Sequence, residues 1–124
     1  TELNALPITA DVHAEILSIG LGKKVTVDEL SVVQRRVRQL ERAFNCRQGL
    51  RRQHDTLPDQ SFADSSPNGN FEGTAIDRGT FEETKDRYYE LRGWDLTTGV
   101  PTRATLESLG LKDVADELER QGVL

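Results

Sequence analysis

Apolar residues recur at every third or fourth position along most of the chain, which is the spacing of one face of a helix. The clearest case is residues 26–45, where a single apolar stripe contains Leu30, Val33, Val37, Leu40 and Phe44. The same spacing predicts further helices over about residues 11–19, 80–92, 102–110 and 112–121. No segment alternates apolar and polar residues as a half-buried strand does. The pattern therefore predicts an all-α fold, a small irregular domain of about five helices.

Polar residues at the expected helix starts support these boundaries. Thr26 and Glu29 have the spacing of a capping box, in which each side chain binds the backbone amide of the other residue. Thr80 and Glu83 repeat that spacing, and Thr102 is placed to cap the next helix. Val12, Ile16 and Ile19 recur at helical spacing in the first helix. The packing face of the third helix is expected to hold Phe81, Tyr88 and Leu91, and the inward face of the last Val114, Leu118 and, less strongly, Ala115.

Residues 53–79 lack regular periodicity and are expected to form one long irregular loop. Turn-forming residues are dense in residues 65–70, and Pro58 restricts its own backbone and that of Leu57. Loops longer than ~12–15 residues are uncommon in a compact domain unless they bind a ligand or wrap a neighbour. We therefore expect this loop to matter for function.

A length of 124 residues fits one domain, so residues 1–124 are expected to form a single helical domain. No apolar run approaches the ~18 residues of a membrane span, and no signal peptide opens the chain, so we expect a cytoplasmic protein without membrane contact. Cys46 is the only cysteine, which excludes an internal disulfide and a cysteine-based metal site. The chain has no methionine and begins at Thr1, so we expect a trimmed protein or, as we favour, a fragment of a longer one.

Positive charge is concentrated in residues 35–52, although the net charge of the whole chain is −5. This arginine segment contains one acid, Glu41, and the arginines Arg35, Arg36, Arg38, Arg42, Arg47, Arg51 and Arg52. An acidic chain with one basic segment and no aromatic platform is not expected to bind nucleic acid. The segment is either a solvated, salt-bridged helix face or a contact for an anion or for an acidic surface of another domain.

Residues with catalytic or metal-binding chemistry are few. No phosphate-binding glycine loop is present, and no cysteines or histidines have metal-ligand spacing. His54 stands beside Asp55, and a carboxylate can orient an imidazole for proton transfer. Cys46 precedes Arg47, whose charge would favour a reactive thiol, but a small half-buried residue near a helix end is the favoured interpretation. We predict no catalytic residue and no metal ligand.

Several linked stretches together resemble one protein family. They are residues 38–49 (RQLERAFNCRQG), 55–58 (DTLP) and 88–95 (YYELRGWD), continued by residues 99–102 (GVPT) and 106–111 (LESLGL). Their order and spacing are similar to those at the carboxyl end of the aldehyde:ferredoxin oxidoreductase family, and the resemblance covers residues 11–118. In such a domain the matched residues are expected to be architectural, with Phe44 anchoring the second helix and Trp94 covering the base of the third.

The resemblance implies an enzyme that oxidises aldehydes to carboxylic acids at a tungsten ion, or sometimes molybdenum, held by two pterin dithiolenes (a tungstopterin or molybdopterin). Electrons would pass through a [4Fe–4S] cluster to ferredoxin. This chain would be the carboxyl-terminal helical domain, which supports the cofactor site, covers the substrate channel and contacts the amino-terminal domains. The family's cluster cysteines and pterin-binding aspartates have no counterpart here, so we expect the isolated chain to bind no cofactor and to be inactive.

Some contacts are expected only in the intact enzyme. There the arginine segment and the loop would face the other domains, and the candidates for contact with cofactor phosphates or acidic residues are Arg47, Arg51, Arg52 and His54. Apolar surface intended for those domains predicts self-association of the isolated chain. Two alternatives stay open: a stand-alone helical protein-interaction module derived from the family, and a small independent enzyme using His54 and Asp55. The substrate, the choice between tungsten and molybdenum, and the oligomeric state also stay open.

Overall fold

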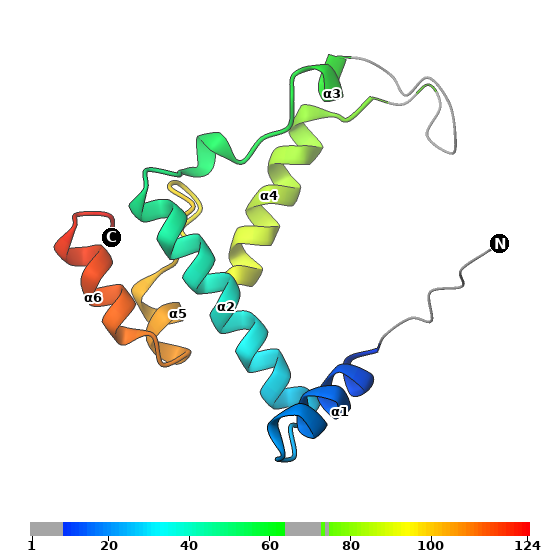
Figure 1. The fold of residues 1–124 in the computed structure, drawn as a ribbon. Helices are drawn as coiled ribbons and strands as arrows, with labels where there is room; N and C mark the ends of the chain where they lie inside the picture. The colour runs from blue at the N-terminus through cyan, green and yellow to red at the C-terminus, as the bar shows by residue number, and fades with distance from the viewer. Residues whose placement is uncertain (1–8, 64–72, 74) are drawn as a thin grey trace. The chain divides into compact units, whose positions relative to one another are not determined.

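The structure is a computed structural model and describes residues 9–63, 73 and 75–124. These residues form six α-helices and one 3-10 turn: α1 (Ala10–Leu21), α2 (Val27–Arg47), η1 (Arg52–His54), α3 (Gln60–Ala63), α4 (Arg78–Arg92), α5 (Arg103–Ser108) and α6 (Lys112–Arg120) (Figure 1). Within the described ranges the β pairing is limited to an isolated bridge between Trp94 and Pro101. The all-α prediction and the five predicted helices are confirmed, and α3 is an additional short helix.

Residues 53–79 contain more regular structure than their sequence indicates, because the end of η1 and all of α3 lie within them. The two ends of this stretch are joined at the start of α4. There the Arg78 guanidinium binds the Asp59 carboxylate at 3.0 Å and lies 4.1 Å from the centre of the Phe62 ring. Phe62 in turn packs edge-on against Phe81. The turn-forming residues predicted at 65–70 lie outside the described residues.

The chain divides into two compact units, residues 1–39 and residues 40–124, which we call unit 1 and unit 2. Unit 1 contains α1 and the first part of α2. Unit 2 contains the rest of α2 and every later element. Each unit is described by itself.

Unit 1 consists of two helical segments joined by a turn that is held by short-range hydrogen bonds. Gly22 ends α1 in the left-handed conformation, with φ +65°, which costs glycine little because it has no Cβ. The Ser18 hydroxyl accepts a 2.8 Å hydrogen bond from the amide of Val25 and so ties the turn back to α1. The predicted capping box is confirmed, since the Thr26 amide binds Glu29 at 2.8 Å and the Glu29 amide binds the Thr26 hydroxyl at 3.2 Å.

Most of the apolar residues that recur at helical spacing in unit 1 are exposed. Val12, Ile16 and Ile19 have exposed side chains, and the residue of α1 that is buried is Ala14. In the α2 stripe, Leu30 is buried, but Val33 and Val37 are exposed. These apolar positions follow helical periodicity correctly, but the described part of the chain supplies nothing to cover them.

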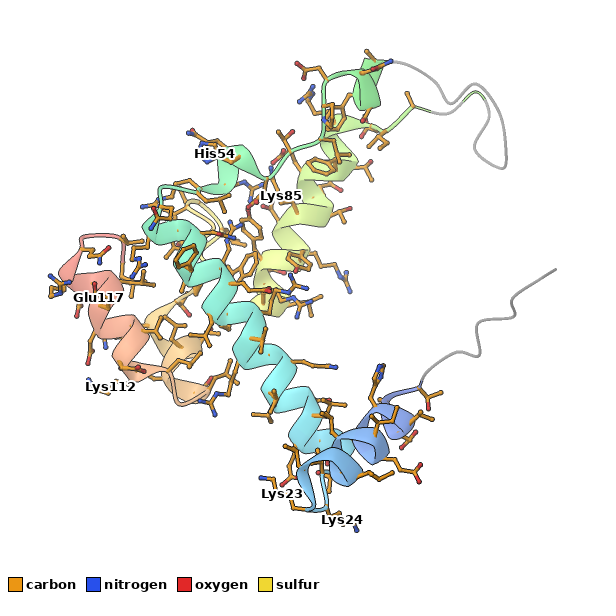
Figure 2. All side chains as sticks on the ribbon, viewed as in Figure 1. Lys23, Lys24, His54, Lys85, Lys112 and Glu117 are labelled. Carbon is orange, nitrogen blue, oxygen red and sulfur yellow. The ribbon has the colours of Figure 1, made fainter. Side chains whose placement is uncertain are left out.

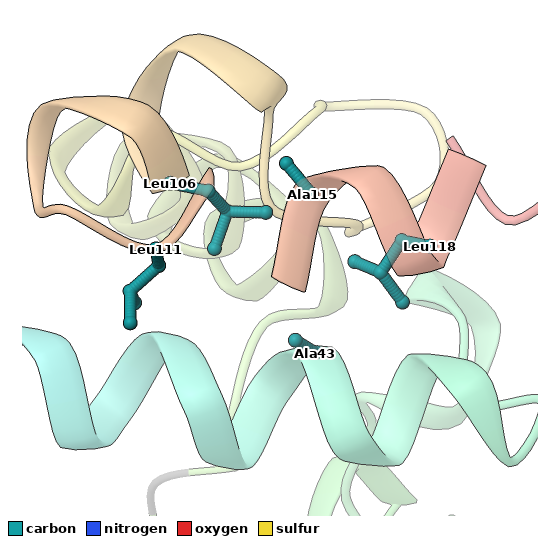
Figure 3. Packing of buried hydrophobic residues seen from close by; sticks show 5 residues of the cluster. All are labelled: Ala43, Leu106, Leu111, Ala115 and Leu118. Atoms are coloured by element: carbon teal, nitrogen blue, oxygen red, sulfur yellow. The ribbon is translucent and has the colours of Figure 1, made fainter. Parts of the chain in front are cut away.

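The core of unit 2 lies where α5 and α6 pack against the second part of α2 (Figure 3). It consists of Ala43, Leu106, Leu111, Ala115 and Leu118, with Val114 partly buried at its edge. Thr102 caps α5 as predicted, since its hydroxyl accepts a hydrogen bond from the Thr105 amide. The predicted inward face of α6 is confirmed, because Ala115 and Leu118 lie in this core and Val114 packs at its edge.

Two predictions for α4 are wrong. The helix begins at Arg78, where Asp77 accepts a 2.7 Å hydrogen bond from the Thr80 amide, so Asp77 is the cap in place of a Thr80–Glu83 box. The buried residue of α4 is Tyr89, which is 1% exposed, whereas Leu91 is 80% exposed. Of the predicted packing face, Leu91 is therefore wrong, whereas Phe81 packs against Phe62 and Tyr88 against Trp94.

The part of α2 in unit 2 also buries a face that apolar periodicity does not mark. Arg42, Ala43 and Cys46 are buried, while Leu40 and Phe44 from the predicted stripe are exposed. The expectation that Phe44 anchors the helix is therefore wrong within this chain.

Trp94 occupies the position that the sequence indicates. Its ring packs edge-on against the rings of Tyr88 and Tyr89, with centroids 5.5 Å and 5.4 Å away. It is 7% exposed and covers the carboxyl end of α4, as expected.

Candidate functional site

The four predicted contact residues lie close together in the sequence of unit 2, between the end of α2 and the end of η1. Arg47 is the last residue of α2, Arg51 precedes η1, and Arg52 and His54 begin and end η1. Figure 2 labels His54 on this turn. The structure gives the four side chains different surroundings, so each is considered in turn.

Arg51 closes the carboxyl end of α2. Its guanidinium donates to the carbonyl oxygens of Cys46 at 2.6 Å and Leu50 at 2.8 Å. The last carbonyls of a helix have no partner inside the helix, and the negative end of the helix dipole favours a cation there. Arg51 therefore has a local structural role that its position in a basic segment does not reveal.

Arg52 joins η1 to α4. Its guanidinium binds the carboxylate of Glu82 at 2.7 Å and that of Asp86, and it donates to the Leu96 carbonyl at 2.9 Å. The hydrogen bond with Glu82 is the main reason why the pKa of Arg52 is raised. Because its side chain is 19% exposed and its donors bind acceptors within unit 2, Arg52 stabilises the fold of this unit.

Arg47 and His54 face solvent. The guanidinium of Arg47 lies 5.2 Å from the centre of the Phe44 ring, and the side chains of Arg47 and His54 are both exposed. The Nδ1 atom of His54 accepts a 2.9 Å hydrogen bond from the Arg51 amide. These two residues are therefore the members of the predicted set that present polar groups outward.

The proposed pairing of His54 with Asp55 does not occur. Nδ1 of His54 faces the backbone of Arg51, and Nε2 lies 3.5 Å from the side-chain amide of Gln53. The Asp55 carboxylate instead faces Arg42 and Tyr89. An imidazole that no carboxylate orients gives no support to an independent enzyme built on these two residues.

Arg42 is the centre of the most highly connected polar cluster in unit 2, and the sequence interpretation did not single it out. Its two terminal nitrogens bind the Asp55 carboxylate at 2.9 Å and 2.5 Å, and Nε donates to the Gly99 carbonyl at 2.8 Å. The guanidinium also lies 4.4 Å from the centre of the Trp94 ring. A two-pronged arginine–carboxylate pair with a face-on aromatic ring fixes both the position and the orientation of the side chain.

Tyr89 completes this network by donating its hydroxyl proton to Asp55. Burial raises the pKa of Asp55, but the hydrogen bonds from Arg42 and Tyr89 outweigh burial and hold that pKa below its ordinary value. Burial and the bond to Asp55 raise the pKa of Tyr89 to about 12. Asp55 is therefore ionised and Tyr89 neutral near pH 7, and neither group is poised to exchange a proton at that pH.

The network brings together residues from four of the five linked stretches of the family resemblance. Arg42 comes from residues 38–49, Asp55 from residues 55–58, Tyr89 and Trp94 from residues 88–95, and Gly99 from residues 99–102. The hydrogen bond between Arg42 and Gly99 spans 57 positions of sequence. At Gly99, which has φ +74°, an added Cβ would lie 2.4 Å from a terminal nitrogen of Arg42, so a side chain there would displace the guanidinium. These four stretches thus meet at one architectural point.

Cys46 has the environment of a structural residue. It is 0% exposed, and burial raises the pKa of its thiol despite the nearby guanidinium groups of Arg42 and Arg51. A buried thiol with a raised pKa carries little thiolate and is inert. Cys46 is more deeply buried than the favoured half-buried interpretation predicts, and its surroundings contradict the reactive one.

The described residues contain no group of three or more histidine, cysteine or acidic side chains arranged to hold a metal ion. Across the same ranges, none of the helices combines the length and the apolar character that crossing a membrane requires.

Comparison with known proteins places this architecture in a family. A family model that describes domains 2 and 3 of aldehyde ferredoxin oxidoreductase matches residues 3–111. The tungsten-containing aldehyde ferredoxin oxidoreductases of Pyrococcus furiosus and Pyrococcus horikoshii are each 31% identical over 105 residues, and that of Thermococcus kodakarensis is 30% identical over the same length. Each alignment covers 84% of this chain, which spans 17% of the relative's length.

A solved structure is similar in fold and sequence. The active-site complex of benzoyl coenzyme A reductase, determined with 1,5-dienoyl-CoA, superposes with a TM-score of 0.74 at 31% identity. The superposition covers 93% of this chain and 16% of the other chain. The family model matches well over half of the sequence, and the relatives agree with it. This chain belongs to the aldehyde ferredoxin oxidoreductase family.

Proposed function

We propose that this chain is the carboxyl-terminal helical domain of an enzyme like the tungsten-containing aldehyde ferredoxin oxidoreductases. In that enzyme it supports the cofactor site and covers the substrate channel, and it does not catalyse the reaction by itself. One observation carries the proposal. The chain is similar in sequence over 105 residues to these oxidoreductases, but it spans only 17% of their length. The parent enzyme would oxidise an aldehyde to a carboxylic acid and pass electrons to ferredoxin, and we infer that it is cytoplasmic.

The side chains present here do not fit the metal centres of such an enzyme. A [4Fe–4S] cluster requires about four thiolates. This chain offers Cys46 alone, fully buried in unit 2 with its sulfur 3.9 Å from the Gly99 carbonyl. The cluster and the tungstopterin, or molybdopterin, are therefore assigned to residues outside this chain, and no step of the reaction is assigned to residues within it.

The contribution of this chain is mechanical. The Arg42 network ties the end of α2, the segment after η1, the end of α4 and the turn at Gly99 to one another. A surface that other domains pack against must keep its shape, and long-range charge-assisted hydrogen bonds of this kind keep it. This rigidity is the property that supporting a cofactor site requires.

Arg47 and His54 are proposed to face the cofactor or acidic residues of the other domains, with Arg51 and Arg52 holding the turn behind them. Support comes from the exposure of Arg47 and His54 and from the internal hydrogen bonds of Arg51 and Arg52. Arg47→Glu in the intact enzyme is expected to lower tungsten and iron content together with activity. Arg87→Glu, at an exposed arginine of α4 outside the arginine segment, is the matched control and should leave all three unchanged. Equal cofactor content and activity in both variants would contradict this role.

The experiment that tests the proposed function is the intact mass of the protein from its native source, measured with its tungsten, molybdenum and iron content. A mass far above 13.9 kDa, with tungsten or molybdenum and about four irons per polypeptide, is the expected result. Ferredoxin-linked aldehyde oxidation would then be assayed on that protein. A mass of 13.9 kDa without these metals would refute the proposal and favour a stand-alone helical interaction module.

A further inference from the structure

Unit 1 buries too little apolar surface to hold its two helical segments together alone. Among its described residues, 9–39, the buried apolar side chains are Ala14 and Leu30. Many larger apolar side chains of this unit are exposed instead: Val12, Ile16, Leu17, Ile19, Leu21, Val32, Val33 and Val37. Isolated helices of this length are marginal in water, and their stability normally comes from packing an apolar face. The apolar surface of unit 1 therefore requires a partner.

Half of the exposed apolar side chains of unit 1 line one groove. The end of α1 and the start of α2 enclose a volume of about 590 Å³ whose apolar lining includes Leu17, Leu21, Val25, Val32 and Val33. Leu21 is 60% exposed and Val33 is 53% exposed, so the lining is accessible along its length. Two helices that leave an apolar groove between them form the type of surface that receives an amphipathic helix.

The charges at the rim of the groove define the chemistry of its partner. Lys23 and Lys24 lie on the turn between α1 and α2 and line the groove with exposed side chains (Figure 2). Two carboxylates, those of Asp28 and Glu29, also line the groove, and that of Glu29 is occupied by the amide and hydroxyl of Thr26. A partner helix that places carboxylates beside the two lysines gains charge pairing, and basic residues at that end would be repelled.

We propose that this groove receives an amphipathic helix from the remainder of the parent polypeptide, with acidic residues of that helix beside Lys23 and Lys24. The inference rests on the proposed function. Its occupant is argued from length, because the relatives are about six times as long as the matched segment and so contain abundant chain outside it. The apolar lining and the lysine rim then specify which kind of segment fits.

The test is hydrogen–deuterium exchange of the α1 amides in the intact parent enzyme and in the isolated 124-residue chain. Val33→Asp places a charge in the groove. Val37→Asp is the matched control, because Val37 is a similarly exposed valine, 48%, one turn further along α2 and outside the groove lining. In the intact enzyme, Val33→Asp is expected to speed exchange in α1 by about tenfold or more, and Val37→Asp to have little effect. In the isolated chain, which lacks the partner helix, neither substitution should change exchange in α1.

A double charge reversal, Lys23→Glu with Lys24→Glu, is a second and milder perturbation at exposed positions. It is expected to speed exchange in α1 of the intact enzyme, by an amount that decreases as salt screens the charges. The proposal is overturned if Val33→Asp acts equally in the intact enzyme and the isolated chain, if it acts in neither, or if Val37→Asp acts as strongly in the intact enzyme. Protection of α1 that rises with the concentration of the isolated chain would assign the groove to a second copy and would also overturn it. Intact mass and metal content report separately on the proposed function, so the two failures are distinguishable.

Discussion

Replacing Arg42 with methionine removes the charge at the centre of the unit 2 network while keeping most of the apolar stem of the side chain. The substitution leaves the Gly99 carbonyl without its 2.8 Å donor and removes both arginine bonds to Asp55. It also removes the cation that lies 4.4 Å from the centre of the Trp94 ring. What remains for the Asp55 carboxylate is the hydroxyl of Tyr89 and the nearby charge of Lys85.

The cost follows from the burial of the two charges. Breaking a fully buried ion pair by removing one partner costs about 3–5 kcal/mol, because the other charge is left uncompensated. Arg42 is 7% exposed, but the side chain of Asp55 keeps 27% exposure, so solvent relieves part of that penalty. We therefore expect Arg42→Met to lower the free energy of unfolding by about 2–4 kcal/mol. Small domains have about 5–15 kcal/mol in total, so this loss is large.

Urea unfolding followed by tryptophan fluorescence measures this change where it occurs. Trp94 is the single tryptophan of the chain and lies in the network, so its emission reports on unit 2. Arg36→Met is the matched control, since Arg36 is an exposed arginine of the same helix, and we expect its effect to stay within about 0.5 kcal/mol. Adding Asp55→Asn to Arg42→Met should cost less than the sum of the single changes, with a coupling of about 1 kcal/mol or more. The reasoning would be refuted if Arg42→Met cost no more than the control, or if the two changes were additive.

Four further outcomes follow from the structure. Because the folded-state pKa of Asp55 is lowered, its contribution to stability is present above its unfolded pKa of about 3.9 and is lost as pH falls through the folded-state pKa. Asp55→Asn should therefore flatten the loss of stability that begins below about pH 5 in urea titrations. The thiol of Cys46 should react with a disulfide reagent at least about a hundredfold more slowly in the native protein than in urea, and rapid native labelling would show that it is not buried. Gly99→Ala should lower the free energy of unfolding, measured by thermal unfolding, by more than about 2 kcal/mol. The loss should be clearly greater than for Gly110→Ala, because Gly110 has a similar φ of +69° but open space where a Cβ would lie. Equal losses would contradict the close approach of Arg42. The isolated chain should self-associate in sedimentation experiments, and Phe44→Asp should weaken this association by adding a charge to exposed apolar surface, so a monomer at all concentrations would argue against the expectation.

Periodicity and capping chemistry account for most of the helices. The longer helices begin and end within about two residues of their predicted bounds because the caps at Thr26 and Thr102 and the turn at Gly93 act locally. α3 was not predicted, since four residues are too few to show a helical period. At the start of α4, the cap is Asp77, which lies three residues before the predicted cap, Thr80.

Burial was predicted less well than helix position. An apolar stripe marks a face that is covered somewhere, but it does not say whether the covering element belongs to the same chain. This accounts for the exposed Val33, Val37 and Phe44. Hydropathy also excludes Arg42 from any core, although its pairing with Asp55 allows it to be 7% exposed.

The polar network could be assembled only in three dimensions. Its members lie in the stretches that carry the family resemblance, so the sequence marks them as a set. No local rule, however, pairs Arg42 with Gly99 across 57 positions. The predicted contact residues were chosen by charge alone, and charge does not separate Arg51 and Arg52, which bind internal acceptors, from Arg47, which faces solvent.

The long separation between Arg42 and its last acceptor has a consequence during synthesis. Ribosomes add about 5–20 residues per second, so roughly 3–11 s pass between the addition of Arg42 and that of Gly99. Throughout this interval the guanidinium must stay hydrated, because its partners at Tyr89, Trp94 and Gly99 are not yet all made. A nascent chain halted before Gly99 therefore carries a cation that cannot be buried, on a face of α2 that is not yet covered. Translation pauses shortly before residue 99 would expose this incompletely packed face of α2 to chaperones and proteases.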